Sequence, residues 1–205
     1  MNIPGITWRG ESPDDIEIMP ELPPELVSVL AEVNGFIVHS GALHVRGASL
    51  KPEWHSLRSA WHGPQAFHVL YEALLSSDIP FAQDQLGDQF LMRGGQIYRL
   101  GAETGEVSSF CESLSAFFDG LAGDVETFLN VSFEHTLQPG ELLHAYPPFC
   151  VKGDSIATSL FPCPAPEVIL VHAGLAKEIA ELPDGTRIQI RPPKRRTKRI
   201  QRTPR

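Results

Sequence analysis

The stretch IPFAQDQLGDQFLMRGGQIYRLGAETGEV, residues Ile79–Val107, decides the fold. Its apolar residues fall in short runs, and Arg-Gly-Gly-Gln at 93–96 separates two of them. A short glycine-containing turn between two such runs is a strong signal for a β-hairpin. Glu-Thr-Gly at 103–105 predicts a further corner before a strand at 107–110, and 79–82 is expected to be the strand that leads in. The stretch therefore predicts a meander of short antiparallel strands.

The same stretch carries Asp84 and Asp88 beside several glycines, a combination that also occurs in metal- and phosphate-binding loops. However, it lacks the ligand spacing of a calcium-binding EF-hand, and neither GxGxxG nor GxxxxGK[ST] occurs. Acids that flank a turn more often cap it or lie in solvent. We therefore interpret the glycines as hairpin corners and the aspartates as turn or surface acids. We expect no metal and no cofactor.

Helices are predicted on both sides of the meander. In LPPELVSVLAEVNGF, residues 22–36, two prolines suit a helix start, the apolar residues share one face, and Asn-Gly supplies the stop. The runs FIVH and ALHV then predict a hairpin over 36–45. Residues 111–133 predict two more helices, with Asp124 as the N-cap of the second. The expected fold class is α+β, an antiparallel meander sheet packed by helices.

Two Trp-His dipeptides, at 54–55 and 61–62, lie in a region where two short helices are expected. On a helix, a spacing of seven places Trp54 and Trp61 on nearly the same face. One interpretation is a stacking or ligand-binding surface. The favoured one is that the tryptophans pack the helix onto the sheet, with the histidines at its rim, because aromatic residues at helical spacing are usually packing residues.

Composition changes after residue 136, and we expect three parts. A domain over 1–136 is followed by a C-terminal α/β appendage over 137–190, packed on that domain, and by a disordered basic tail over 191–205. Within the appendage, 137–150 is expected to cross irregularly because it contains Pro147-Pro148. Residues 164–174 are expected to be a buried strand or the start of a helix, 174–182 a short helix, and 186–190 a last strand.

Charge is distributed unevenly along the chain. The formal net charge is -8, yet the tail holds eight Lys or Arg and no acid, which leaves about -16 on residues 1–190. An acidic body repels nucleic-acid phosphates and attracts basic partners. The basic tail alone is compatible with RNA, DNA or an acidic membrane surface. No apolar run is long enough to cross a membrane and no signal peptide is visible, so we expect a cytoplasmic protein.

Motifs for catalysis or metal binding are missing from the sequence. No GxSxG, HxH, HExxH or CxxC occurs, and the eight histidines are interpreted as structural. Cys150 lies near His144 in the sequence, but nothing indicates the third, orienting group that a cysteine-histidine pair needs. We therefore expect no catalytic residues and no enzyme.

The order of these motifs resembles that of the SUKH superfamily, which includes a yeast cell-wall-synthesis regulator and many bacterial toxin-immunity proteins. The shared features are a Leu-Pro helix start that ends in Asn-Gly, a strand with Pro-Phe-Ala, an Asp and a Gly-Asp. A strand that ends at Leu100 and a helix two turns later complete the pattern. The resemblance covers roughly residues 20–133. It implies an α+β scaffold without catalysis, which in bacterial members binds and neutralises a cognate toxin, often one delivered by contact-dependent or type VI systems.

Partner surfaces differ among members of that superfamily, so no binding residue carries over from it. From their expected positions on turns of the meander, we predict that Asp84, Asp88, Glu103 and Glu106 form part of the surface that binds a toxin. Many such toxins are basic, which agrees with the acidic body. The alternative function is a scaffold or nucleic-acid-associated protein that acts through the tail at 191–205.

Overall fold

The computed structural model describes residues 3–151, 157–183 and 185–186, and its largest element is a seven-stranded sheet. The strands follow one another in chain order and each pairs antiparallel with the next, which confirms the predicted meander. They are β1 (Ile6–Arg9), β2 (Phe36–Val38), β3 (Leu43–Val45), β4 (Ile79–Asp84), β5 (Gln89–Arg93), β6 (Gln96–Leu100) and β7 (Val107–Cys111).

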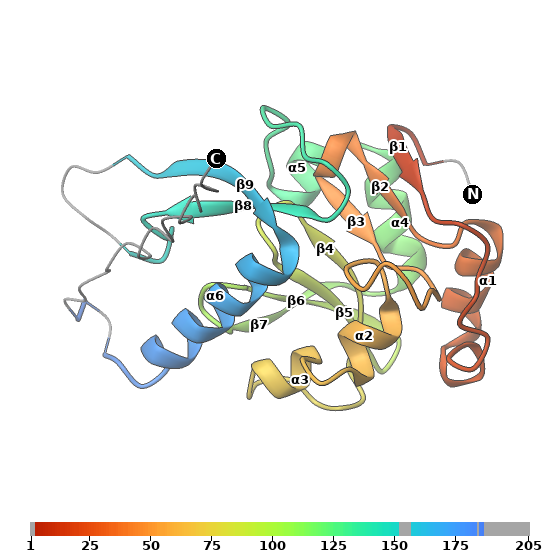
Figure 1. Cartoon of the computed structure of the whole chain (residues 1–205), viewed down its shortest axis with the longest axis horizontal. Helices are drawn as coiled ribbons and strands as arrows, with labels where there is room; N and C mark the ends of the chain where they lie inside the picture. The colour runs from red at the N-terminus through yellow and green to blue at the C-terminus, as the bar shows by residue number, and fades with distance from the viewer. Residues whose placement is uncertain (1–2, 152–156, 184, 187–205) are drawn as a thin grey trace, which may run out of the picture.

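Helices pack on this sheet, so the predicted α+β class is confirmed. They are α1 (Pro24–Glu32), α2 (Leu57–His62), α3 (Phe67–Leu70), α4 (Leu114–Ala122), α5 (Val125–Leu129) and α6 (Ala165–Ile179), with short 3-10 helices η1 (Met19–Glu21) and η2 (His39–Gly41). Strands β8 (Glu141–Tyr146) and β9 (Ser159–Pro164) form a separate hairpin. Figure 1 shows this hairpin and α6 at one end of the molecule and α1 at the other. In the described part of the chain, every helix is too short or too polar to cross a membrane.

The β5–β6 turn shows why the glycines of the meander are needed. Gly94 and Gly95 have φ of 59° and 85°, and Arg93 pairs with Gln96 across them. A two-residue hairpin turn with positive φ at both central positions matches the twist of the flanking strands, and glycine adopts it without steric cost. The glycines are therefore hairpin corners, as predicted.

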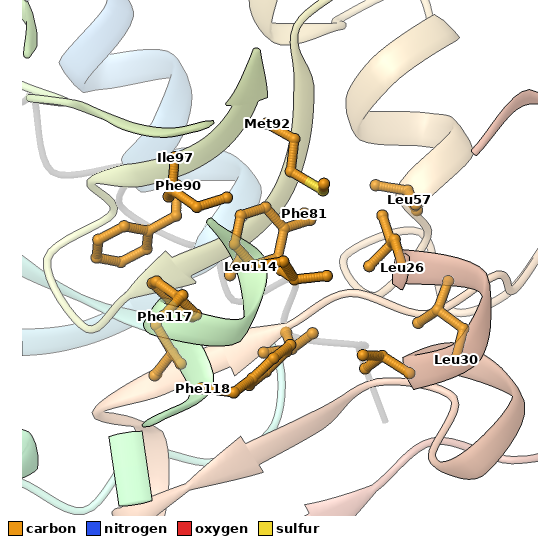
Figure 2. Close-up of a cluster of buried hydrophobic side chains, with 14 of the residues drawn as sticks. Leu26, Leu30, Leu57, Phe81, Phe90, Met92, Ile97, Leu114, Phe117 and Phe118 are labelled. Atoms are coloured by element: carbon orange, nitrogen blue, oxygen red, sulfur yellow. The ribbon is translucent and has the colours of Figure 1, made fainter. Parts of the chain in front are cut away.

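The core lies between the sheet and α4. Ser113 caps α4 by accepting a hydrogen bond from Ala116 N at 3.1 Å, and the apolar face that follows is buried. Phe117 of this face contacts Phe81 and Phe90, with ring centroids 5.1 and 5.0 Å apart. Figure 2 shows these three side chains close together within the buried cluster. Asp124 caps α5 through Thr127 N, as predicted.

The region around the two Trp-His dipeptides differs from the prediction. Ser56 caps α2 by accepting from Ser59 N, so the helix begins only at Leu57 and Trp54 lies before it. The prediction that Trp54 and Trp61 lie on one helical face is therefore wrong. Trp61 is buried in the core, which agrees with the packing interpretation. His55, expected at the rim, is instead 1% exposed.

The C-terminal elements also correct the prediction. Residues 137–150 contain the regular strand β8 and do not cross irregularly, because β9 pairs with its full length. Most of the segment 164–182 is one helix, α6, so the expected helix start at 164–174 is confirmed and the separate short helix at 174–182 is its continuation. Ala173 and Ala176 of α6 pack against residues of α3, β5 and β6. The expected strand at 186–190, apart from Thr186, and the tail at 191–205 lie outside the described residues, and the proposed domain boundaries stay predictions.

Replacing Phe117 with Ala should lower the free energy of unfolding by about 3–5 kcal/mol, because it leaves a cavity among packed aromatic rings. Urea titration followed by circular dichroism measures the change. As a control, Val69→Ala removes a side chain from a residue that is 62% exposed and should change stability by less than about 0.5 kcal/mol. Equal effects of the two substitutions would contradict this placement of the core.

Candidate functional site

A cavity of about 540 Å³ lies where turns of the meander meet the C-terminal elements. It is lined by residues from the β4–β5 and β6–β7 turns, the end of α5, β8, the segment after β8, and α6. The polar side chains that matter for its chemistry are Asp88, Arg99, Glu103, Cys150 and His172.

A buried ion-pair network forms one side of this cavity. The Arg99 guanidinium donates from Nη2 to Asp84 Oδ2 at 2.7 Å, from Nε to Asp88 Oδ2 at 2.9 Å, and from Nη1 to the carbonyl of Leu129 at 3.0 Å. All three nitrogens are therefore engaged within the protein. The network joins the β4–β5 turn, β6 and the end of α5.

Asp84 lies beneath the surface, although we predicted it as part of a binding surface. Its side chain is fully buried, and its Oδ1 accepts hydrogen bonds from Leu86 N and Asp88 N at 2.9 and 3.1 Å. It therefore caps the turn, as one of the two interpretations held, and its placement at the surface is wrong. Burial raises the pKa of Asp84, the Asp88 carboxylate adds to this, and Arg99 opposes both.

Of the other three predicted acids, two line the cavity and one lies outside it. Asp88 is 23% exposed and also accepts from Ala102 N at 2.8 Å. Glu103 is half-buried, and its Oε2 accepts from Cys150 N at 2.9 Å. Both line the cavity, whereas Glu106 is exposed outside it. The structure thus brings Asp88 and Glu103 to one site and leaves Glu106 on the surface.

His172 is the residue of this site that the sequence did not reveal. It is 3% exposed, and neither ring nitrogen has a hydrogen-bond partner among the described residues. The ring of His144 stacks beside it at 6.1 Å between centroids. Burial, and then His144, lower the pKa of His172 to about 4, so near neutral pH its imidazole offers one donor and one acceptor. No motif marks His172, because the segments around it are distant in sequence.

Cys150 does not have the properties of a nucleophile. Burial, and then Glu103, raise the pKa of its thiol to about 11, so the sulfur is protonated near neutral pH. A reactive cysteine needs a thiolate, which nearby positive charge favours and a carboxylate disfavours. Within the described ranges, no group of three or more His, Cys, Asp or Glu is arranged to hold a metal ion. The arrangement is therefore suited to binding through hydrogen bonds and charge.

A second buried polar cluster holds together the N-terminal part of the fold. His55 Nε2 lies 3.0 Å from the carbonyl oxygen of Asn34, and His55 Nδ1 lies 2.9 Å from His44 Nε2. Because a carbonyl only accepts, His55 Nε2 carries the proton and His55 Nδ1 accepts from His44. Glycines at 10, 35 and 47 surround the His55 ring so closely that a Cβ on any of them would lie within 2.6 Å of it. This cluster is structural.

Comparisons with protein-family models, with curated proteins and with solved structures give no significant match to this chain. The resemblance to the SUKH superfamily therefore stays a prediction. The fold itself rests on the strand pairing and packing described above.

Replacing Arg99 with Met should lower the free energy of unfolding by about 3–5 kcal/mol, because it leaves the buried Asp84 without its counter-charge. Adding Asp84→Asn to that variant should recover part of the loss, since the amide oxygen still accepts from the turn N–H groups. Urea unfolding measures both variants. Lys51→Met, which breaks only the exposed pair with Glu53, is the control with little expected effect. Additive losses in the double variant would contradict the proposed charge balance.

Stability should fall on acidification because of the buried histidines. Burial lowers the pKa of His55 to about 4 from its ordinary 6.5, so between these values the unfolded chain binds more protons than the folded one. The free energy of unfolding therefore rises with pH in this window, and His55 contributes about 3 kcal/mol that is lost from pH 7 to 4. His55→Gln should be less stable at pH 7 and show a flatter pH dependence. Parallel curves for both proteins in urea titrations would contradict this.

Proposed function

We propose that this chain is a non-catalytic cytoplasmic protein that binds and neutralises a basic protein partner, in the manner of bacterial toxin-immunity proteins of the SUKH type. One observation carries the proposal. Among the described residues, 17 acidic residues are exposed but only three basic ones, Arg9, Lys51 and Lys177.

In the described part of the chain, this imbalance arises because most of the basic side chains are buried or half-buried. Arg58, Arg93 and Arg99 are half-buried and bound to Asp15, Asp78 and Asp84, which are themselves buried. Most of the other acids in the described part of the chain are exposed, and few basic side chains are exposed there beside them. A surface of one sign raises the association rate with an oppositely charged protein and disfavours nucleic-acid phosphates. The surface is thus suited to a basic protein.

Two segments supply many of the exposed acids. The first runs from the end of β1 to Glu25 in α1, and the second runs from Glu112, just before α4, to Glu134 after α5. Their acids are Glu11, Asp14, Glu17, Glu21 and Glu25 in the first, and Glu112, Asp119, Asp124, Glu126 and Glu134 in the second. Of the four acids predicted from the sequence, Glu106 is the exposed one, and Asp84 is too deeply buried to contact a partner. A stable interface of about 1,600 Å² would need one such segment together with its apolar neighbours.

The direct test is co-expression with the product of the neighbouring gene. If that product is a toxin, this chain should co-purify with it and restore growth of cells that produce it. The association rate should fall steeply with added salt, because surface charge steers the encounter. A neighbouring product without toxicity, together with no protection against candidate toxins, would overturn the proposal.

Two matched variants locate the interface. One changes Glu112, Asp119 and Asp124 to their amides, and the other changes Glu17, Glu21 and Glu25, so both alter net charge equally. The variant at the interface should raise the dissociation constant about tenfold or more, while the other should change mainly the association rate. Calorimetry and stopped-flow mixing separate the two effects. Unchanged binding of both variants at all salt concentrations would exclude an acidic interface on these segments.

Deleting 191–205 separates the proposal from its alternative. Neutralisation of the toxin should survive this deletion. If the deletion abolishes function and the intact chain binds nucleic acid with strong salt dependence, the scaffold or nucleic-acid-associated function is supported instead.

A further inference from the structure

We propose that the cavity at His172 is a binding site for an organic cation, a guanidinium or ammonium group on a short apolar stem. The site goes beyond the proposed function, because it needs no protein surface and accepts the cation either from a free small molecule or from a side chain. Only the second source rests on the proposed function.

Carboxylates outnumber cationic side chains among the described residues that line this cavity. The carboxylates of Asp88 and Glu103 both line it, and each has further lone pairs beyond those it already uses. Among the described residues that line the cavity, Arg99 is the one charged donor, and three of its five N–H groups already donate to Asp88, Leu129 and Asp84. A cation that brings several N–H groups therefore finds acceptors, whereas an anion meets two carboxylates.

His172 is the independent observation that points to a ligand. A buried polar group normally has a hydrogen-bond partner, yet both ring nitrogens of His172 have none within the described part of the chain. The neutral imidazole presents one nitrogen lone pair, which is an acceptor for an N–H of the cation. Binding such a group would satisfy a buried nitrogen that the fold itself leaves without a partner.

The backbone is shaped to bring the β4–β5 turn close to this histidine. Gly87 has φ of 91°, and a Cβ at this position would lie 3.5 Å from His172 Nδ1 and 3.3 Å from Leu142 Cδ1. A side chain at Gly87 would be strained by the positive φ and tight against Leu142, and it would touch His172 at an ordinary contact distance. Glycine therefore allows the turn that carries Asp88 to lie against α6.

The remaining lining suits the apolar stem of such a ligand. Leu86, Leu143, Ala145 and Phe149 supply the apolar part of the wall. A cavity of about 540 Å³ falls within the range of small-ligand sites, which are mostly apolar with a few placed polar groups. The stem would lie against these side chains while the charged end meets Asp88, Glu103 and His172.

Matched pairs of probes test the charge requirement on the full chain. Butylguanidinium is compared with butylurea, its neutral isostere, and N-acetyl-arginine methylamide with the corresponding citrulline derivative. Calorimetry should show that at least one of the two cations binds at least about tenfold more tightly than its own neutral partner, because a hydrogen bond to a charged group is stronger. Long-range proton–nitrogen NMR should show that the acceptor nitrogen of His172 shifts on saturation with the cation.

The two pairs also distinguish the source of the cation. Equal affinity for butylguanidinium and capped arginine indicates a site for free organic cations. Binding of capped arginine alone indicates a site for the side chain of a protein. Both outcomes support the proposed chemistry, and both are measured without a protein partner, so failure of the toxin experiments leaves them unaffected.

Glu103→Gln and Glu106→Gln form the matched variants, since both acids lie in the β6–β7 turn region but only Glu103 lines the cavity. Affinity for the cation should fall about tenfold in Glu103→Gln and stay unchanged in Glu106→Gln. His172→Phe should weaken binding while thermal melting shows that the fold is kept, and Glu103→Gln still tests the site if that variant unfolds. Equal binding of cation and neutral isostere in both pairs, equal effects of the two glutamates, or a His172 nitrogen that does not shift would overturn the proposal.

Discussion

The buried contact between Arg99 and its two aspartates is the interaction on which the rest of the structure depends. Charges removed from water are tolerated only when each is paired and its remaining hydrogen bonds are satisfied. Arg99 meets this condition by binding Asp84, Asp88 and the carbonyl of Leu129, which lie in the β4–β5 turn and at the end of α5. One side chain thus fixes the sheet, a helix and one wall of the cavity relative to one another.

The parts of the fold that the sequence predicts are those set by neighbouring residues. The β5–β6 turn follows from Gly94-Gly95, because that backbone conformation favours glycine, and α4 follows from apolar residues at helical spacing after Ser113. Asp124 caps α5 for the same local reason. In each case the signal lies within a few residues of the element it forms.

The candidate site depends instead on contacts between distant segments. Asp84 looks like a surface acid because it flanks a turn, and its burial becomes tolerable only through Arg99, fifteen residues further along the chain. His172 enters the cavity from α6, whereas Glu103 and Cys150 come from other segments and meet over a separation of 47 residues. Strand β8 was missed for a similar reason, since its partner β9 follows only after an intervening segment. Local sequence patterns carry no information on which segments meet.

The pairing of arginines with buried aspartates links the acidic surface to the cavity. Because Arg58, Arg93 and Arg99 are bound to buried aspartates, few basic side chains among the described residues are left to offset the exposed acids. The resulting field attracts cations from a distance, while the acceptors of the cavity are close enough to select among them by geometry. Asp88 belongs to both arrangements, since it binds Arg99 and also lines the cavity. A cation that binds the Asp88 carboxylate therefore perturbs the ion pair between Asp88 and Arg99. Because this ion-pair network holds the fold together, occupancy of the cavity is coupled to the stability of the meander.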